Sequence, residues 1–196
     1  MVQENQLYGL AIILAGSVRK LFEGRGIRFS SKPTLVKKPI IEFMRRMRIF
    51  GMEKFNNPTF VSTINYYLNI KELKKRSVWG LIAIYVEQDY LASLMRLLQY
   101  PQVDDEDVEG MKDACGALCN LIGGQFRIDL LRHGYTNLEM SHFSSYLNRS
   151  TGGVEFYDKI REKYEVNFYI KREKRLVVEI AMGPIPKIQP REKRFS

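Results

Sequence analysis

The spacing of apolar residues along the chain predicts three helices. In segment 6–22 they recur every three or four positions, and Gly24 follows as a stop signal. Segment 88–99 has the same period and ends before Pro101. A longer helix is predicted over 104–132, where the acidic run DDEDVE at its start complements the helix dipole.

Runs of β-branched and aromatic residues predict strands. Segments 59–70 and 78–87 are separated by the polar link KELKKRS and should pair antiparallel. Segment 27–36 contains Pro33, which confines it to a sheet edge or a bulge. Further elements are expected at 137–148 (a strand), near 154–162 (a short helical piece) and at YEVNFYIK and RLVVEIAM (a final hairpin).

These elements fit one α/β (α+β) domain over residues 1–183. The economical arrangement is one largely antiparallel sheet of about five or six strands with helices packed on one face. The chain has 196 residues, of which 45% are hydrophobic, and this is enough for one such core. Segment 184–196 is basic and proline-rich without periodicity, so we expect a disordered tail there.

Composition limits the chemistry that the chain can perform. No apolar run approaches the roughly 20 residues of a membrane span, and no signal-peptide pattern opens the sequence, so the cytoplasm is the expected compartment. Cys115 and Cys119 are expected to be small buried hydrophobic residues rather than a redox pair. The sequence has no second Cys/His pair, no P-loop and no paired-carboxylate site, so we expect neither a metal nor a cofactor.

The net charge of +9 raises nucleic acid as a partner. Basic residues are concentrated in short runs at strand ends and in the tail, and such runs are usually solvated turns. Nucleic-acid binding is therefore the weakest functional hypothesis. It would require an affinity that falls steeply as salt rises.

The helix predicted over 104–132 has two contrasting faces. At about 100° per residue, Asn120 points about 200° away from Leu118 and from Ile122, so it should face solvent. Asp113, seven residues earlier, lies almost above Asn120. The buried stripe is predicted to contain Met111, Cys115, Leu118, Ile122 and Phe126.

Small residues surround Asn120 on a helical wheel of this segment. A glycine inside a helix costs on the order of 1 kcal/mol relative to alanine, so their presence needs a reason. One interpretation is a docking surface, where small residues let a partner approach while Asp113 and Asn120 supply polar contacts. The other is close internal packing against helix 6–22 or a loop. The small residues are Gly116, Ala117, Gly123 and Gly124.

The segment DACGALCNLIGG, preceded by VDDEDVEGMK, resembles the central helix of the CheC/CheX/FliY phosphatases, and of CheX most closely. The resemblance extends over most of residues 6–182, through VWGLIAIYV and DYLASLMRLL to LVVEIAM. It implies a cytoplasmic, dimeric chemotaxis protein of two-component signalling. Its partner would be the receiver domain of a phosphorylated CheY-type response regulator, and its activity aspartyl-phosphate hydrolysis.

In that family the helix carries Glu-x-x-Asn, and the asparagine orients the water that attacks the phosphate. By resemblance, Asn120 corresponds to this catalytic asparagine and Asp113 to a preceding Asp or Ser. The family glutamate, which is thought to pair with a lysine of the regulator, is replaced by Ala117. Orientation of water by an amide could survive this change, whereas the charge that fixes the docking is lost. We therefore expect weak phosphatase activity or none, with partner binding retained.

Segment 39–55 fits the expected fold poorly and is interpreted as an inserted basic amphipathic helix. It could cover the sheet, dock a partner or a second copy, or contact a membrane surface or nucleic acid; Met-rich surfaces adapt to partners. This supports an alternative function, a non-catalytic interaction module. Its candidate contact residues are Phe43, Arg45, Arg46, Met47 and Arg48.

Overall fold

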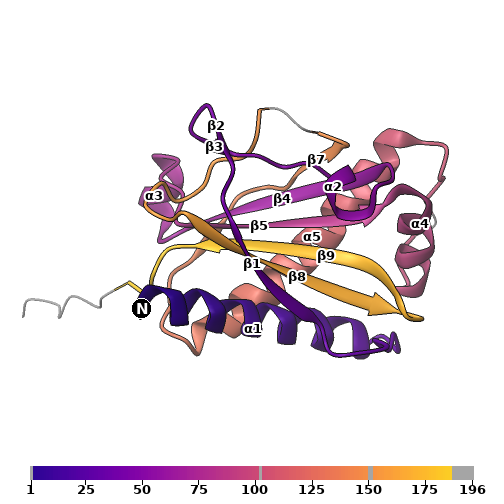
Figure 1. Cartoon of the computed structure of the whole chain (residues 1–196), viewed down its shortest axis with the longest axis horizontal. Helices are drawn as coiled ribbons and strands as arrows, with labels where there is room; N and C mark the ends of the chain where they lie inside the picture. Colours follow the sequence, from indigo (N-terminus) through magenta and orange to yellow (C-terminus); the bar gives the residue numbers. More distant parts are fainter. Residues whose placement is uncertain (1, 102, 150–151, 187–196) are drawn as a thin grey trace, which may run out of the picture.

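The computed structural model describes residues 2–101, 103–149 and 152–186. Within them, an antiparallel sheet is covered on one face by two long helices, α1 (Val2–Glu23) and α5 (Val108–Leu131), as Figure 1 shows. The α/β (α+β) prediction with helices packed on one face is confirmed. None of the helices in these ranges is long and apolar enough to cross a membrane.

The main sheet has seven strands in the described part of the chain, in the order β1-β8-β9-β5-β4-β6, with β7 also paired to β4. Both predicted hairpins form: β4 pairs with β5, and β8 pairs with β9, each in antiparallel register. The strands are β1 (Thr34–Pro39), β4 (Thr59–Tyr67), β5 (Gly80–Glu87), β6 (Glu139–Met140), β7 (Ser144–Leu147), β8 (Glu162–Ile170) and β9 (Glu173–Met182).

Several predicted bounds change in the structure. The polar link between β4 and β5 contains a short helix, α3 (Ile70–Lys74), which Asn69 caps by accepting from two backbone N–H groups. The strand predicted over 137–148 is divided into β6 and β7. The helical piece predicted near 154–162 is absent from these described residues, because Val154 forms a β-bridge with Met47 instead. Helix α4 (Gln88–Leu97) follows β5 as expected.

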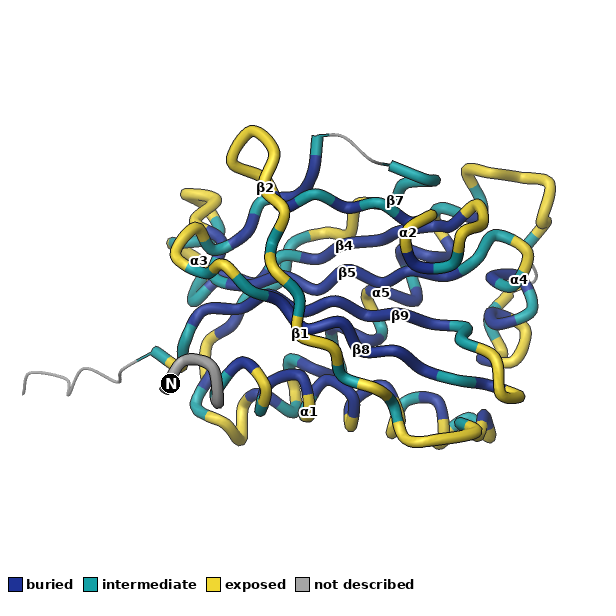
Figure 2. Tube along the Cα trace, viewed as in Figure 1, coloured by how far each residue is buried: buried dark blue, intermediate teal, exposed yellow. Residues whose placement is uncertain are grey.

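Buried side chains form a separate core on each face of the sheet. The larger core lies between the sheet and helices α1, α4 and α5. The smaller one lies on the opposite face, beneath residues 40–55 and 154–160. Figure 2 shows buried positions running along β4, β5, β8 and β9, whereas β1 at the edge is largely exposed. Both faces of the central strands are therefore covered, which explains their nearly continuous apolar sequences.

Segment 39–55 covers the second face as a hairpin rather than as the predicted amphipathic helix. Strands β2 (Glu42–Phe43) and β3 (Arg46–Met47) pair antiparallel, and a four-residue helix, α2 (Met52–Phe55), follows them. The two residues of the turn both have positive φ, which fits the type I′ turn of a tight hairpin. Burial of Met47 on the sheet, beside Val154, outweighs the helical spacing of the sequence.

The second core also contains a buried ionic cluster, formed by Lys54 with Glu165 and Glu179. The two glutamates lie directly opposite each other on β8 and β9. Lys54 Nζ donates to both of them, at 2.7 Å and 2.5 Å. Lys163 Nζ lies 2.7 Å from Glu179, whose other oxygen accepts from Tyr85 Oη at 2.7 Å. Two like charges are thereby held side by side inside the fold.

The lysines determine the protonation state of this cluster. Burial by itself would raise the pKa of Glu179, but Lys163 and Lys54 outweigh it and lower this pKa to about 2. Burial likewise opposes the charge of Lys54, yet Glu179 and Glu165 raise its pKa. The cluster is therefore charged at neutral pH.

The segment predicted as a disordered tail, 184–196, falls mostly outside the described residues. Of its first residues, Pro184 accepts a hydrogen bond from Trp79 Nε1 at 3.0 Å through its carbonyl oxygen. Single-domain organisation over 1–183 stays a prediction.

The ionic cluster predicts a loss of stability in acid. The pKa of Glu179 is depressed from 4.5 to about 2, so its contribution is present above pH 4.5 and is lost as pH falls toward 2. The corresponding change in the free energy of unfolding is about 3 kcal/mol. Urea unfolding between pH 7 and pH 2.5 should show a weaker acid dependence in Glu179→Gln than in wild type. The exposed control Glu106→Gln should keep the wild-type dependence, and an unchanged slope in Glu179→Gln would contradict the assignment.

Candidate functional site

Helix α5 is positioned by its first turn and by its apolar stripe. Asp107 caps the helix, because its side chain accepts from the Glu109 backbone N–H at 3.1 Å. The predicted buried stripe is confirmed, since all five of its side chains are fully buried: Met111, Cys115, Leu118, Ile122 and Phe126. Tyr66 Oη on β4 donates to the Gly123 carbonyl oxygen at 3.0 Å and ties the helix to the sheet.

The opposite side of α5 is open to solvent, as the helical wheel predicts. Asp113 and Asn120 are exposed. Ala117, which lies between them, and Gly124, one turn after Asn120, are half-buried. These four residues are called the α5 strip below. A Cβ added at Gly124 would meet no atom within 4 Å, so this part of the helix is open to the approach of another molecule.

The remaining two small residues lie inside the fold. A Cβ at Gly116 would overlap the ring of Phe143, which comes from the loop between β6 and β7. A Cβ at Gly123 would lie 3.1 Å from Tyr66 Oη. The internal-packing explanation therefore holds for two of the four small residues, and the docking surface stays a prediction for the other two. Internal packing accounts for Gly116 and Gly123, which leaves Ala117 and Gly124 as candidate contacts for a partner.

The polar groups of the α5 strip are not engaged by the described part of the chain. Neither the Asn120 amide nor the Asp113 carboxylate has a hydrogen bond or ion pair there. An unengaged amide can orient a water molecule or a phosphate oxygen, and an unengaged carboxylate can receive a cation. One turn beyond Gly124, Arg127 lies 4.0 Å from Glu139 and adds a charged pair beside the strip.

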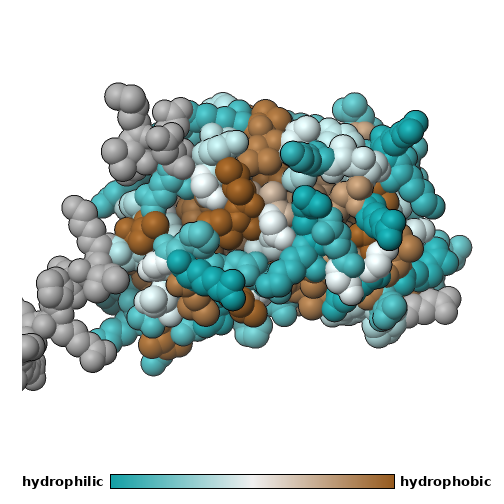
Figure 3. All heavy atoms as spheres, turned by 90° about the horizontal axis from the view of Figure 1, so that it is seen from below, coloured by the Kyte–Doolittle hydropathy of each residue, from teal (hydrophilic) through white to brown (hydrophobic). Residues whose placement is uncertain are grey.

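Apolar residues continue the open side of α5 toward its C-terminal end. Ile128 and Leu131 are 57% and 48% exposed, and Ile12 on the neighbouring helix α1 is 50% exposed. Figure 3 shows apolar residues gathered in patches among hydrophilic ones on the α1 side of the molecule. The open side of the helix pair therefore offers apolar contact area in addition to the polar groups of the α5 strip.

Phe143 is the neighbour of the helix that sequence analysis missed. It covers Gly116 from a loop more than twenty residues later in the chain. No periodicity connects the two positions, so only the fold brings them together.

The other residues considered for chemistry lie apart from the strip. Cys115 and Cys119 are buried, and burial raises the pKa of both thiols, that of Cys119 to about 12. They are small core residues, as expected, and not activated nucleophiles. Among the described residues, no group of His, Cys, Asp and Glu side chains could hold a metal ion.

Only some of the candidate contact residues predicted in segment 39–55 lie unpaired on the surface. Met47 is fully buried. Arg46 lies 3.7 Å from Glu155, and Arg48 is paired with Glu53. Phe43, Met44 and Arg45 form the exposed tip of the hairpin, with 80% of Met44 exposed; the last two occupy its turn.

Comparisons with known proteins identify the fold. No protein-family model matches the sequence, and no curated protein matches it. Similar solved structures include FliY from Thermotoga maritima, with a TM-score of 0.59 and 12% identity, covering 92% of this chain and 91% of that one. CheX from Desulfovibrio desulfuricans has a TM-score of 0.54 and 15% identity, covering 89% of this chain and 99% of that one.

A third similar structure is a CheX-CheY-BeF3-Mg complex from Borrelia burgdorferi. Its matching chain has a TM-score of 0.50 and 17% identity, covering 91% of this chain and 98% of that one. At sequence identities of 12–17%, these comparisons show similarity of fold. The chain has the fold of the CheC/CheX/FliY chemotaxis proteins, as the resemblance of its central helix implies.

The glycines of α5 give a matched pair of tests. Gly124→Ala should raise the free energy of unfolding by about 1 kcal/mol, because alanine favours the helix and nothing obstructs its Cβ. Gly116→Ala should lower it by about 1 kcal/mol, because the Phe143 ring must move. Urea unfolding of both variants measures the difference.

A double-mutant cycle provides the control for Gly116. In a Phe143→Ala background, Gly116→Ala should become neutral or stabilising. A destabilisation that persists in this background would show that another neighbour requires the glycine.

Proposed function

We propose that this chain is a CheX-like domain of chemotaxis signalling that binds the receiver domain of a phosphorylated CheY-type response regulator through the α5 strip. The observation that carries the proposal is an exposed, unengaged Asn120 on a helix whose neighbouring positions are small. A similar fold occurs in the CheX-CheY complex, which supports the choice of partner. Such a role belongs in the cytoplasm, and a homodimer is proposed on the same resemblance.

The proposed chemistry is limited by Ala117. In the receiver's site, the Asn120 amide would orient the water that attacks the aspartyl phosphate in line, an effect of position that requires no charge. Ala117 lies three residues before Asn120, about 4.5 Å along the helix axis, and has no carboxylate for a partner lysine. Asp113 lies about 10 Å before Asn120 along the axis, so it cannot occupy the same place. Docking without efficient dephosphorylation is therefore the proposed state.

Apolar contact supports docking without that carboxylate. Ile128 and Leu131 lie two to three turns beyond Asn120 on the open side of α5, and each is about half exposed. Their burial against a partner would be favourable at roughly 25 cal/mol per Å² of apolar surface.

Dephosphorylation of a phosphorylated CheY-type receiver from the same organism tests the proposal. Wild type should accelerate it weakly or not at all, and Ala117→Glu should increase the rate about tenfold or more by restoring the charge. Asn120→Ala should abolish any acceleration in either background. Ala117→Gln, of similar length without charge, is the matched control and should resemble wild type. Absence of binding to any CheY-type receiver, phosphorylated or not, would refute the proposal.

A second candidate function, a non-catalytic interaction module, is favoured by the tip of the β2–β3 hairpin. Phe43 and Met44 are apolar and exposed, and Arg45 adjoins them with no hydrogen bond or ion pair within the described residues. Apolar side chains combined with arginine are typical of protein contacts.

The triple variant Phe43→Ser, Met44→Asn, Arg45→Gly separates the two candidates. It introduces Asn-Gly, which favours a type I′ turn, and removes only exposed side chains, so the hairpin should be retained. If the α5 strip binds the receiver, the affinity measured by titration calorimetry should remain within about twofold of wild type. If receiver binding is lost in this triple variant but not in variants of the α5 strip, the receiver binds the hairpin and not the strip.

A further inference from the structure

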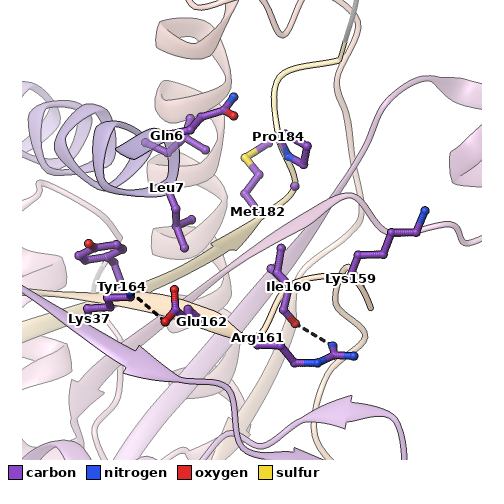
Figure 4. Close-up of a pocket in the computed structure, with 12 residues that line it drawn as sticks. Gln6, Leu7, Lys37, Lys159, Ile160, Arg161, Glu162, Tyr164, Met182 and Pro184 are labelled. Carbon is purple, nitrogen blue, oxygen red and sulfur yellow. Dashed lines mark hydrogen bonds and ion pairs between the residues drawn. The ribbon is translucent and has the colours of Figure 1, made fainter. Parts of the chain in front are cut away.

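A cavity of about 250 Å³ lies at the end of the molecule where α1 begins. Its walls come from α1, from β1 and β8 at the sheet edge, and from the residues that follow β9 (Figure 4). The wall after β9 is held by Tyr135, which follows α5 in the chain: its Oη donates to the Gly183 carbonyl oxygen at 2.9 Å. The α5 strip plays no part in it: Asn120 lies 11 residues before the end of α5, about 16 Å along the axis.

Apolar side chains make up most of the interior of the cavity, beside the polar side chains of Gln6 and Tyr164. Leu7 and Leu10 of α1 and Met182 of β9 are buried core residues that also line it, and Ile160 closes the side toward β8. Figure 4 shows the side chains of Leu7, Met182 and Ile160, from three different segments, around one common space. These apolar groups would contact an apolar body of a ligand, and the charged groups of the lining lie at the mouth.

The mouth of the cavity is cationic. Among the described residues, its charged lining consists of Lys37, Lys159 and Arg161 with one carboxylate, that of Glu162, which lies 2.9 Å from Lys37 Nζ. The three cations and one anion among these described residues have a formal charge of +2 (3 − 1).

Arg161 is held by backbone carbonyl oxygens through one of its nitrogens, and its other N–H groups remain available. Its Nη1 donates to the carbonyl oxygens of Asp158 at 2.5 Å and Ile160 at 3.0 Å. Within the described residues, its Nε and Nη2 donate to no other group, and Lys159 has no ion pair. A guanidinium held by backbone carbonyls is oriented in advance, and its remaining N–H groups suit a carboxylate or a similar oxyanion.

We propose that this cavity binds a small organic anion with an apolar body, specifically a monocarboxylate of about eight to ten non-hydrogen atoms. At about 30 Å³ for each water-sized group, 250 Å³ accommodates roughly eight such groups. The apolar part contacts Leu7, Leu10 and Met182, and the carboxylate accepts from Arg161 at the mouth with Lys159 nearby. Apolar walls with a few polar groups that fix orientation are the usual composition of ligand sites.

Titration of the 196-residue chain with octanoate, followed by two-dimensional ¹⁵N–¹H NMR, tests this site. Octanoate should shift resonances of residues 7–10, 159–164 and 182–183, with a dissociation constant of about millimolar or tighter. Arg161→Gln should weaken binding about tenfold through loss of the charge-assisted hydrogen bonds. Arg172→Gln, the matched loss of one exposed arginine at the distant β8–β9 turn, should leave the affinity unchanged.

Two further ligands separate the contributions of charge and apolar body. Acetate, which has the carboxylate alone, and octylammonium, which has the chain with the opposite charge, should each bind at least tenfold more weakly than octanoate. Equal affinity for acetate or for octylammonium would overturn the proposed ligand class. Octanoate shifts absent from these residues, or equal weakening by Arg161→Gln and Arg172→Gln, would overturn the site itself. None of these outcomes depends on receiver binding by the α5 strip.

Discussion

The arrangement of the molecule depends on the contact between the apolar stripe of α5 and the sheet. Five side chains of this stripe are fully buried, and burial of each of the four larger ones is worth about 1.5–3 kcal/mol relative to exposure. Gly123 lies close to β4 because it has no Cβ, and Tyr66 bonds to its carbonyl oxygen. With the helix fixed in rotation, Asn120 is directed outward. The proposed reactive group is thus placed by the burial of residues on the opposite side of the same helix.

The two faces of the sheet are stabilised differently. Toward the helices, the core is apolar, and the adaptable side chains of Cys115 and Cys119 fill space without reactivity. On the other face, a hairpin and a single-turn helix cover a smaller apolar core. The buried Lys54–Glu165–Glu179 cluster lies on this face. Removal of one member of such a cluster leaves an uncompensated buried charge, which costs more than the intact cluster contributes. The stability of this face therefore depends on pH. Between the helices, the carboxylate with a lowered pKa is Asp129, which accepts from Ser17 Oγ at 2.8 Å.

The two proposed binding regions lie in different parts of the molecule and require different properties. The α5 strip is convex and has small residues beside one amide, which suits insertion into the site of another protein. The cavity beside α1 is concave and apolar with a cationic mouth, which suits a small anion. The strip could be predicted from sequence because one helix contains all of it. The cavity could not, because its walls come from α1, β1, β8 and the chain after β9, which are distant in sequence.

The sequence by itself determined the elements whose signals are local and periodic. These are the long helices, the two β-hairpins and the outward direction of Asn120, since a helical or strand period fixes which side chains share a face. Only the tertiary structure decided the form of segment 39–55. Its spacing permits a helix, but burial of Met47 against the sheet favours a hairpin. The fold also decided which small residues are internal, because Phe143 reaches Gly116 from a distant loop while Gly124 stays open. Contacts between segments far apart in the chain leave no period in the sequence, and so they appear only once the chain is folded.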